Sequence, residues 1–210
     1  MSATFVRARK KIWDADIDWL VDNIKFLLID VQSLTQAKAI TGATNATPIS
    51  IASTAHGLTT GDFVDIHGVA GNTNANGHRK VTVTDANNYT LQDPVTGANI
   101  AGSGAYTSGG FGISLEVIEF ISDVSAAIVS RSSNLASKTS TRGIIDAADP
   151  QFATVSGATS ELMMVAKDTG SDATSPVFLL ISSFTSGMPV IPNGGNIDVL
   201  LNALGIAQSF

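Results

Sequence analysis

The three histidines of this chain, His56, His67 and His78, carry the imidazoles that could bind a metal ion such as zinc. Their spacing does not form a local ligand set, because two of them precede glycines and the third lies beside Arg79, whose charge disfavours a nearby cation. The chain has no cysteine, which excludes thiolate ligands for zinc or an iron-sulfur cluster. We therefore expect loop and strand-end roles for the histidines, and neither a metal nor a cofactor.

A second candidate for metal chemistry is a run of closely spaced carboxylates: Asp14, Asp16, Asp18 and Asp22. Alternate carboxylates can converge on calcium. A calcium loop of the helix-loop-helix kind needs a glycine at its sixth position and a distal glutamate, whereas Trp19 and Leu20 follow here. The run is more typical of a solvated acidic face or the start of a helix.

Serine is abundant, so a Ser-His-Asp hydrolase is the third possibility. No G-x-S-x-G sequence occurs that would place a serine on a nucleophile elbow. The glycine-rich stretches KDTGSD and PNGGN could be mistaken for phosphate-binding loops, but neither joins a strand to a helix in the required order, and both favour hairpin turns. No acid, base and nucleophile set can be named, and we expect a protein that is not an enzyme.

Residues that could contact a partner gather near the N-terminus: Arg7, Arg9, Lys10, Lys11, Trp13 and Trp19. The basic residues predict a solvated arm, residues 1 to about 11, that only a partner would order; the alternative is a contact with nucleic acid. A net charge of -6 and a pI near 4.8 argue against general nucleic-acid binding. The two tryptophans are core residues or anchors of an interface.

The composition indicates a neutral, polar surface, since only 14% of the 210 residues are charged and 6% are aromatic. Apolar runs such as residues 26–29 and 177–181 are far shorter than the roughly 20 residues of a membrane-spanning helix. The N-terminal basic residues precede the acidic stretch WDADIDW, which cannot be the core of a signal peptide. We expect no membrane span, and synthesis in the cytoplasm.

The positions of apolar runs and turn residues divide the chain into two outer zones, 1–45 and 109–210, and an inserted zone, 46–108. In the first outer zone, NIKFLLIDV predicts a strand that is covered on both faces and central in its sheet. In the inserted zone, short alternating runs at 63–66 and 81–84 are separated by Gly/Asn/Thr-rich turns, which indicates a small all-β barrel or sandwich.

Near its end the last outer zone contains MPVIPNGGNIDVLL, residues 188–201. Prolines fix φ and Asn-Gly-Gly supplies positive φ, so this stretch predicts a sharp turn between Val190 and Asn196. Every second residue is apolar in Ile197, Val199 and Leu201, with the polar Asn196 and Asp198 among them, which predicts a half-buried strand after the turn. Helix should be a minor component. The expected fold is all-β: a jelly-roll-like antiparallel β-sandwich formed by the outer zones, with a small inserted β-barrel domain.

The outer zones contain a W-x-x-D-x-I-K strand (residues 19–25), a D-A-x-D-x-x-F-x-x-V-S-G segment (146–157), a K-D-T-G turn (167–170) and a P-x-x-P-N-G-G-x-I strand (189–197). In this order they resemble a structural protein family of tailed-bacteriophage virions. The resemblance implies a place in the virion of a phage and synthesis in the cytoplasm of its bacterial host.

The inserted zone separately resembles the small β module named after the first catalytic-cysteine half-domain of ubiquitin-activating enzymes, which recurs in phage tail and surface proteins. The similar residues are His56-Gly57-Leu58, Thr60-Gly61-Asp62, Gly68-Val69, Asn76-Gly77, Val81 and Tyr89-Thr90-Leu91. Only the fold is implied, because the chain has neither the cysteine nor an adenylate-binding loop.

These resemblances lead to the hypothesis of a non-enzymatic virion structural protein, first a capsid cement or decoration protein that binds the particle through its β-sandwich and projects the inserted module. Its partners would be phage capsid, neck or tail proteins and further copies of itself in the symmetry of the particle. One alternative is a tail, neck or baseplate component. Another is a receptor- or carbohydrate-binding module of a tail fibre, for which the inserted zone offers the aromatics Phe63, Tyr89 and Tyr106.

Overall fold

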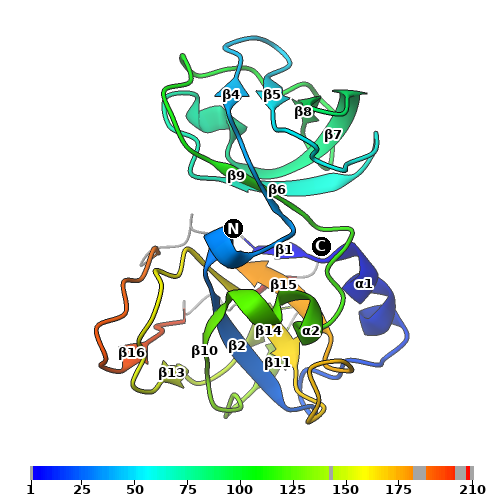
Figure 1. The fold of residues 1–210 in the computed structure, drawn as a ribbon. Coiled ribbons are helices and arrows are strands. Elements are labelled where there is room, and N and C mark those ends of the chain that lie inside the picture. Colours follow the sequence, from blue (N-terminus) through cyan, green and yellow to red (C-terminus); the bar gives the residue numbers. More distant parts are fainter. Residues whose placement is uncertain (1, 142–143, 182–187, 202–206, 209–210) are drawn as a thin grey trace. The chain divides into compact units, whose positions relative to one another are not determined.

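A computed structural model describes residues 2–141, 144–181, 188–201 and 207–208 (Figure 1). Strands make up 37% of the structure and helices 11%, and the sheets are antiparallel, which confirms the expectation of an all-β chain. Two compact units are present. Unit 1 is the continuous stretch Thr35–Val117, and unit 2 comprises the described residues of Ser2–Leu34, Ile118–Ile181 and Thr185–Phe210. Unit 1 is thus inserted between two segments of unit 2 along the sequence.

Unit 2 contains the strands β1 (Ser2–Thr4), β2 (Ile24–Ile29), β10 (Ile128–Arg131), β11 (Thr139–Thr141), β12 (Ile144–Asp146), β13 (Gln151–Phe152), β14 (Leu162–Lys167), β15 (Val177–Ile181), β16 (Ile197–Asp198) and β17 (Ala207–Gln208). Its α-helices are α1 (Val6–Trp13) and α2 (Ile121–Val124), and its 3₁₀ helices are η1 (Val31–Ser33) and η3 (Ser125–Ala127).

The main sheet of unit 2 has the strand order β1-β15-β14-β2-β10, and two small sheets have the orders β11-β12-β17 and β13-β16. The sequences of β2, β14 and β15 are apolar except for Lys25 and Lys167, and almost every residue in them is buried. Such runs are expected where both faces of a sheet are covered. β2 was predicted to be central in its sheet; it is an interior strand between β14 and β10, but it is next to the edge strand β10 and β14 is the middle strand.

The N-terminal segment is part of this sheet, and the prediction of a solvated arm that only a partner orders is wrong. β1 pairs with β15, with Ala3 opposite Leu180, and the next residue, Phe5, is fully buried. The basic residues begin only after this anchor, in α1. The prediction of an arm used only the local run of basic residues. A three-residue edge strand whose partner lies near residue 180 has no local signal in the sequence, so it was missed.

The C-terminal turn follows the prediction in part. Gly194 has a φ of +82°, the left-handed conformation expected of the Asn-Gly-Gly turn. The strand after it is shorter than predicted, since only Ile197–Asp198 pairs, with β13. Beyond that pair the Val199 N–H bonds to the carbonyl of Pro150, which has no N–H to return.

Unit 1 contains β3 (Ala37–Ala39), β4 (Gly42–Ala43), β5 (Ser50–Ala52), β6 (Phe63–His67), β7 (Gly77–Asp85), β8 (Asn88–Gln92), β9 (Phe111–Ser114) and the 3₁₀ helix η2 (Thr73–Ala75). These strands form one sheet with the order β3-β9-β6-β7-β8-β5-β4. The predicted runs at 63–66 and 81–84 lie in β6 and β7. The sheet is not a closed barrel, because its two edge strands, β3 and β4, are not paired with each other.

The core of unit 1 is an apolar cluster that includes Ile51, Ile66, Val81, Tyr89 and Leu91. Consecutive strands β6, β7 and β8 pair as neighbours, so the centre of the sheet is built from segments that follow one another in the sequence. The unit is wider than the predicted zone 46–108, since β4 and β9 lie outside that zone and pair with β5 and β6 inside it, and β3 pairs in turn with β9. Whether 46–108 is a separate domain stays a prediction.

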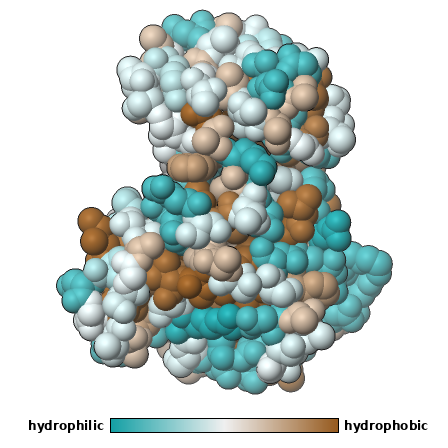
Figure 2. Space-filling view, viewed as in Figure 1, coloured by the Kyte–Doolittle hydropathy of each residue, from teal (hydrophilic) through white to brown (hydrophobic). Residues whose placement is uncertain are grey.

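Hydrophobic side chains also reach the surface of both units (Figure 2). The large ones that are exposed include Ile12, Trp13, Leu20, Val21, Val95, Val117, Ile191 and Leu200. In the part of the chain that the structure describes, no helix is long and apolar enough to cross a membrane.

Candidate functional site

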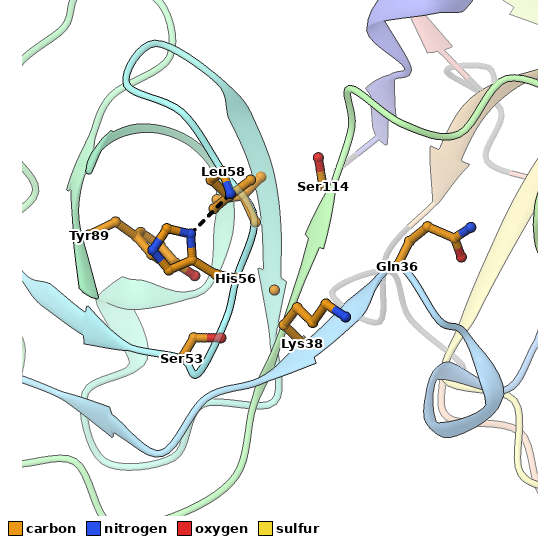
Figure 3. Close-up of a pocket in the computed structure, with 9 residues that line it drawn as sticks. Gln36, Lys38, Ser53, His56, Leu58, Tyr89 and Ser114 are labelled. Carbon is orange, nitrogen blue, oxygen red and sulfur yellow. Dashed lines mark hydrogen bonds between the residues drawn. The ribbon is translucent and has the colours of Figure 1, made fainter. Parts of the chain in front are cut away.

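Unit 1 holds a small polar cavity that is lined by residues of β3, β6, β8 and β9 and of the loop after β5 (Figure 3). Its lining residues are Gln36, Lys38, Ser53, His56, Leu58, Val64, Tyr89, Gly112 and Ser114. The volume, about 10 Å³, is roughly that needed for one water molecule. A cavity of this size cannot hold a substrate.

The cavity places a serine beside a histidine, which is the pair that a hydrolase would need. Ser53 is buried, and its Oγ has no hydrogen-bond partner in the structure. Both nitrogens of the His56 ring, however, are engaged: Nδ1 accepts from the Leu58 N–H at 3.0 Å, and Nε2 lies 2.9 Å from the Asp85 carbonyl oxygen, to which it donates. His56 therefore has no free nitrogen with which to remove a proton from Ser53.

The side chains of Tyr89 and Val64 lie close to Gly112, where a larger residue would not fit without a shift. A Cβ on this residue would lie 3.0 Å from the Tyr89 hydroxyl oxygen and 3.2 Å from a Val64 methyl carbon. Burial raises the pKa of Tyr89, so its phenol is neutral across the physiological range. The cavity is thus lined by hydroxyl groups that can bind a water molecule, those of Ser53, Tyr89 and Ser114, together with the charged side chain of Lys38.

The other two histidines lie in separate aromatic contacts. His67 stacks on Phe111 with ring centroids 6.0 Å apart, and burial lowers its pKa to about 4. His78 stacks on Phe63 at 5.3 Å. Among the described residues there is no group of three His, Asp or Glu side chains that could hold a metal ion.

Asp65 is a residue that the sequence analysis missed. Alternation with Val64 and Ile66 suggests a solvent-facing carboxylate, but Asp65 is buried and its Oδ2 has no hydrogen-bond partner. Burial raises its pKa to about 7, and the charge of Arg79 opposes this only in part. No local signal distinguishes such an aspartate from one on a solvated face.

The four N-terminal aspartates do not converge on one point. Asp18 Oδ1 accepts from the N–H of Leu20 at 2.9 Å, and Asp22 Oδ2 accepts from the Asp18 N–H at 2.7 Å. Asp22 also pairs with Lys167, at 2.9 Å. These carboxylates hold a turn and a salt bridge.

The predicted partner-contact residues separate into two groups. Arg7 and Lys11 both pair with Glu119, at 3.2 and 3.4 Å, and Lys10 pairs with Asp14. The two contacts with Glu119 fasten α1 to the segment before α2, whereas the Lys10–Asp14 pair lies at the end of α1 itself.

The two tryptophans differ in exposure. Trp19 is buried and its Nε1 donates to the carbonyl of Thr139 at 2.8 Å, while Trp13 is 86% exposed. Trp13 is therefore the candidate in this set that presents a large apolar surface to a partner.

The motifs of the outer zones meet in unit 2. Lys25 pairs with Asp168 at 2.6 Å, and Lys167 pairs with Asp22 at 2.9 Å. The Asp168 N–H donates to the Asn23 carbonyl at 2.7 Å. The W-x-x-D-x-I-K strand and the K-D-T-G turn, which are more than 140 residues apart, thus exchange two salt bridges.

The other two motifs also pair with each other. Phe152 lies opposite Ile197 in the β13–β16 ladder, and Gly194 and Gly195 exchange backbone hydrogen bonds with Val155, both at 2.8 Å. The Asn196 side chain accepts from the Thr154 N–H at 3.0 Å. All four motifs therefore serve long-range contacts within unit 2.

The aromatics considered for a sugar site are not exposed platforms. Tyr89 is 1% exposed, and Phe63 and Tyr106 are half-buried. The Tyr106 hydroxyl donates to the Ile40 carbonyl at 2.9 Å. A stacking surface for sugars is not assembled from these three side chains.

Comparisons with known proteins give no identification: no protein-family model matches the chain, and no curated protein matches it significantly.

Proposed function

We propose that the chain is a non-enzymatic structural protein of a tailed-bacteriophage virion, in which unit 2 binds the particle and unit 1 is the module presented outward. The observation that carries the proposal is the mutual pairing of the four motifs that resemble the virion family. They form salt bridges and ladders that fix unit 2, as expected of a family whose shared residues maintain a scaffold.

The chemistry of the candidate sites supports the same proposal. Ser53 lies in a cavity that admits about one water molecule, and both nitrogens of His56 are already engaged. The neutral, polar composition suits contacts between repeated subunits, because little charge must be desolvated when such a surface is buried.

Within this class the proposal places a capsid cement or decoration protein first and a tail, neck or baseplate component second. For the fold, the proposal is a jelly-roll-like sandwich in unit 2 and a barrel-like module in unit 1, whose sheet edges β3 and β4 are separated only by residues 40 and 41.

The experiment is quantitative mass spectrometry of particles purified from the host that carries the encoding genome, followed by electron microscopy of the same particles. A copy number comparable to that of the major capsid subunit supports decoration, and a small ring number supports a neck or tail position. Particles that lack the chain, produced in cells that contain it, would contradict the proposal.

A further inference from the structure

The hydroxyl of Ser53 is a buried polar group of unit 1. Ser53 follows β5 and comes two residues after Ile51, so both side chains point to the core face of the sheet. Ser53 is 1% exposed, and its Oγ has no hydrogen-bond partner among the described residues. A hydroxyl buried in this way destabilises a fold, and such groups commonly mark the position of an ordered water molecule. The surroundings of Ser53 should therefore show whether a water molecule fits there.

The polar side chains that line the cavity beside Ser53 make hydrogen bonds elsewhere. His56 has both ring nitrogens engaged. The Lys38 ammonium group donates to the carbonyl oxygen of Thr35 at 3.3 Å. The Ser114 Oγ accepts from the backbone N–H two residues further on, also at 3.3 Å. A small molecule in the cavity can supply the hydrogen bond that these side chains do not give to Ser53.

Tyr89 brings a second buried hydroxyl group to the same cavity. It lies opposite Ile51 in the β5–β8 ladder, and its ring meets the His56 ring edge-on, with centroids 5.0 Å apart. Tyr89 is 1% exposed, and because burial raises its pKa the phenol keeps its proton and can donate it to a hydrogen bond. A Cβ on Gly112 would lie 3.0 Å from the Tyr89 hydroxyl oxygen, so a residue without a side chain leaves the space in front of this hydroxyl free.

We propose that this cavity binds one water molecule as a permanent part of unit 1, hydrogen-bonded to the hydroxyl groups of Ser53 and Tyr89. The volume of about 10 Å³ suits one water molecule and nothing larger, and Ser114 offers a third hydroxyl to it. In Figure 3 the Ser53 hydroxyl points toward the side of the cavity where Lys38 lies. The positive charge of Lys38 disfavours a cation of similar size, such as sodium or ammonium. Water both donates and accepts, as two facing hydroxyl groups require.

The bound water fixes the inner side of the loop after β5. On the outer side of this loop the Ser53 N–H donates to the Asn87 carbonyl at 2.8 Å, and the Ala55 N–H donates to the Asn87 side-chain oxygen at 2.9 Å. These bonds hold the loop against the turn between β7 and β8. The water joins the same loop to the hydroxyl of Tyr89 in the core. Loss of the water should therefore lower the stability of unit 1.

The first experiment counts long-lived internal water molecules in the full chain by magnetic relaxation dispersion of the water nuclei. Gly112→Ala puts a methyl group into the cavity, 3.0 Å from the Tyr89 hydroxyl oxygen, and should lower the count by one. Gly42→Ala is the matched control, because Gly42 also lies in a strand of unit 1 and its Cβ would meet the Ala52 methyl at an ordinary 3.5 Å. The control should keep the parental count. Equal counts in the parent and in Gly112→Ala overturn the proposal.

The second experiment leaves Gly112 in place and serves if Gly112→Ala does not fold. It is a double-mutant cycle of Ser53→Ala and Tyr89→Phe, followed by urea unfolding of the full chain. Each substitution removes one hydroxyl partner of the water and should raise the unfolding equilibrium constant of unit 1 by about fivefold. The double variant should raise it by less than the product of the two single effects, because either substitution alone already releases the water.

A dry cavity gives the opposite result in this cycle. Ser53→Ala then removes an unsatisfied hydroxyl, so the unfolding equilibrium constant stays the same or falls, and this overturns the proposal. Single effects that multiply without coupling overturn it as well. Both experiments use the isolated protein, so their failure is distinct from a failure of the proposed virion function.

Discussion

Unit 1 and unit 2 are both antiparallel β structures, but their sequences specify them in different ways. In unit 1 the central strands β6, β7 and β8 are consecutive, and their connecting turns are held by short-range bonds such as Asp85 Oδ1 to the Asn87 N–H at 2.8 Å. In unit 2 the strands β1, β2 and β14 find partners from the other half of the chain. Unit 1 should therefore form early from local contacts, while unit 2 must close long loops first.

Polar groups also serve different purposes in the two units. The salt bridges Lys25–Asp168 and Lys167–Asp22 in unit 2 tie distant segments together. In unit 1, Asp65 and His67 are buried on one strand with side-chain atoms that lack hydrogen-bond partners. Such groups reduce stability instead of adding to it.

The largest expected loss of stability comes from truncating one core residue in each unit, which tests whether the two cores unfold independently. Phe26 on β2 and Leu91 on β8 are both fully buried. Phe26→Ala should destabilise unit 2 by about 3–5 kcal/mol, and Leu91→Ala should destabilise unit 1 by about 2–5 kcal/mol. Calorimetry should show that each variant lowers a different transition. If both variants lower a single common transition, the units share one core and the comparison fails.

The buried pair on β6 should give opposite pH dependences. Asp65 has a pKa of about 7 in the fold against about 3.9 unfolded, so between pH 4 and 7 the folded state holds a proton that the unfolded state has lost, and stability falls as pH rises. His67 has a pKa of about 4 against about 6.5 unfolded, so it lowers stability as pH falls through that range.

The two effects partly cancel in the parent, and single variants should separate them. Urea unfolding of Asp65→Asn should show stability rising between pH 4 and 6.5, by at most about 3 kcal/mol. His67→Phe, which keeps the ring against Phe111, should show stability falling between pH 4 and 7, by at most about 4 kcal/mol. Parallel profiles for the two variants would mean that neither group is buried as described.

Two glycines with positive φ should differ in sensitivity. Gly71 in unit 1 has a φ of +81°, and a Cβ there would lie 2.0 Å from the Ala105 carbonyl oxygen. Gly194 in unit 2 has a φ of +82° but no atom within 4 Å of the same position. Gly71→Ala should cost about 3 kcal/mol, from strain and overpacking together, and Gly194→Ala about 1 kcal/mol. Equal losses in chemical denaturation would contradict the packing around Gly71.

The smallest expected effect is the coupling free energy of the salt bridge between Lys167 and Asp22. A double-mutant cycle with Lys167→Met and Asp22→Asn should give a coupling of about 1 kcal/mol, because both side chains are mostly buried. The exposed pair Lys10–Asp14 is the control and should show a coupling near zero. Strong coupling in the control and none in Lys167–Asp22 would reverse the ranking of these contacts.

The difference between local pairing in unit 1 and long-range pairing in unit 2 explains which strands could be predicted from the sequence. Alternation of apolar and polar residues predicted β6 and β7, and the apolar run predicted β2. The pairing of β1 with β15, and the helix that follows it, could not be predicted, because register between distant strands depends on packing of the whole unit. Burial of Asp65 was missed for the same reason.

The candidate site was predictable only as a set of residue types. The sequence identified His56 and the serines, but the bonds that occupy both ring nitrogens of His56 join residues up to 29 positions apart. Trp13 and Trp19 look alike in the sequence, and only the fold assigns one to the surface and the other to the core.

The most direct test of two differently specified units is hydrogen exchange of the full chain, followed by mass spectrometry, in the parent and in Phe26→Ala. We predict that the substitution accelerates exchange of amides in β2, β14 and β15 and leaves those in β6, β7 and β8 at the parental rate. Equal acceleration in both sets of strands would show that the chain folds as a single cooperative core and would contradict the account.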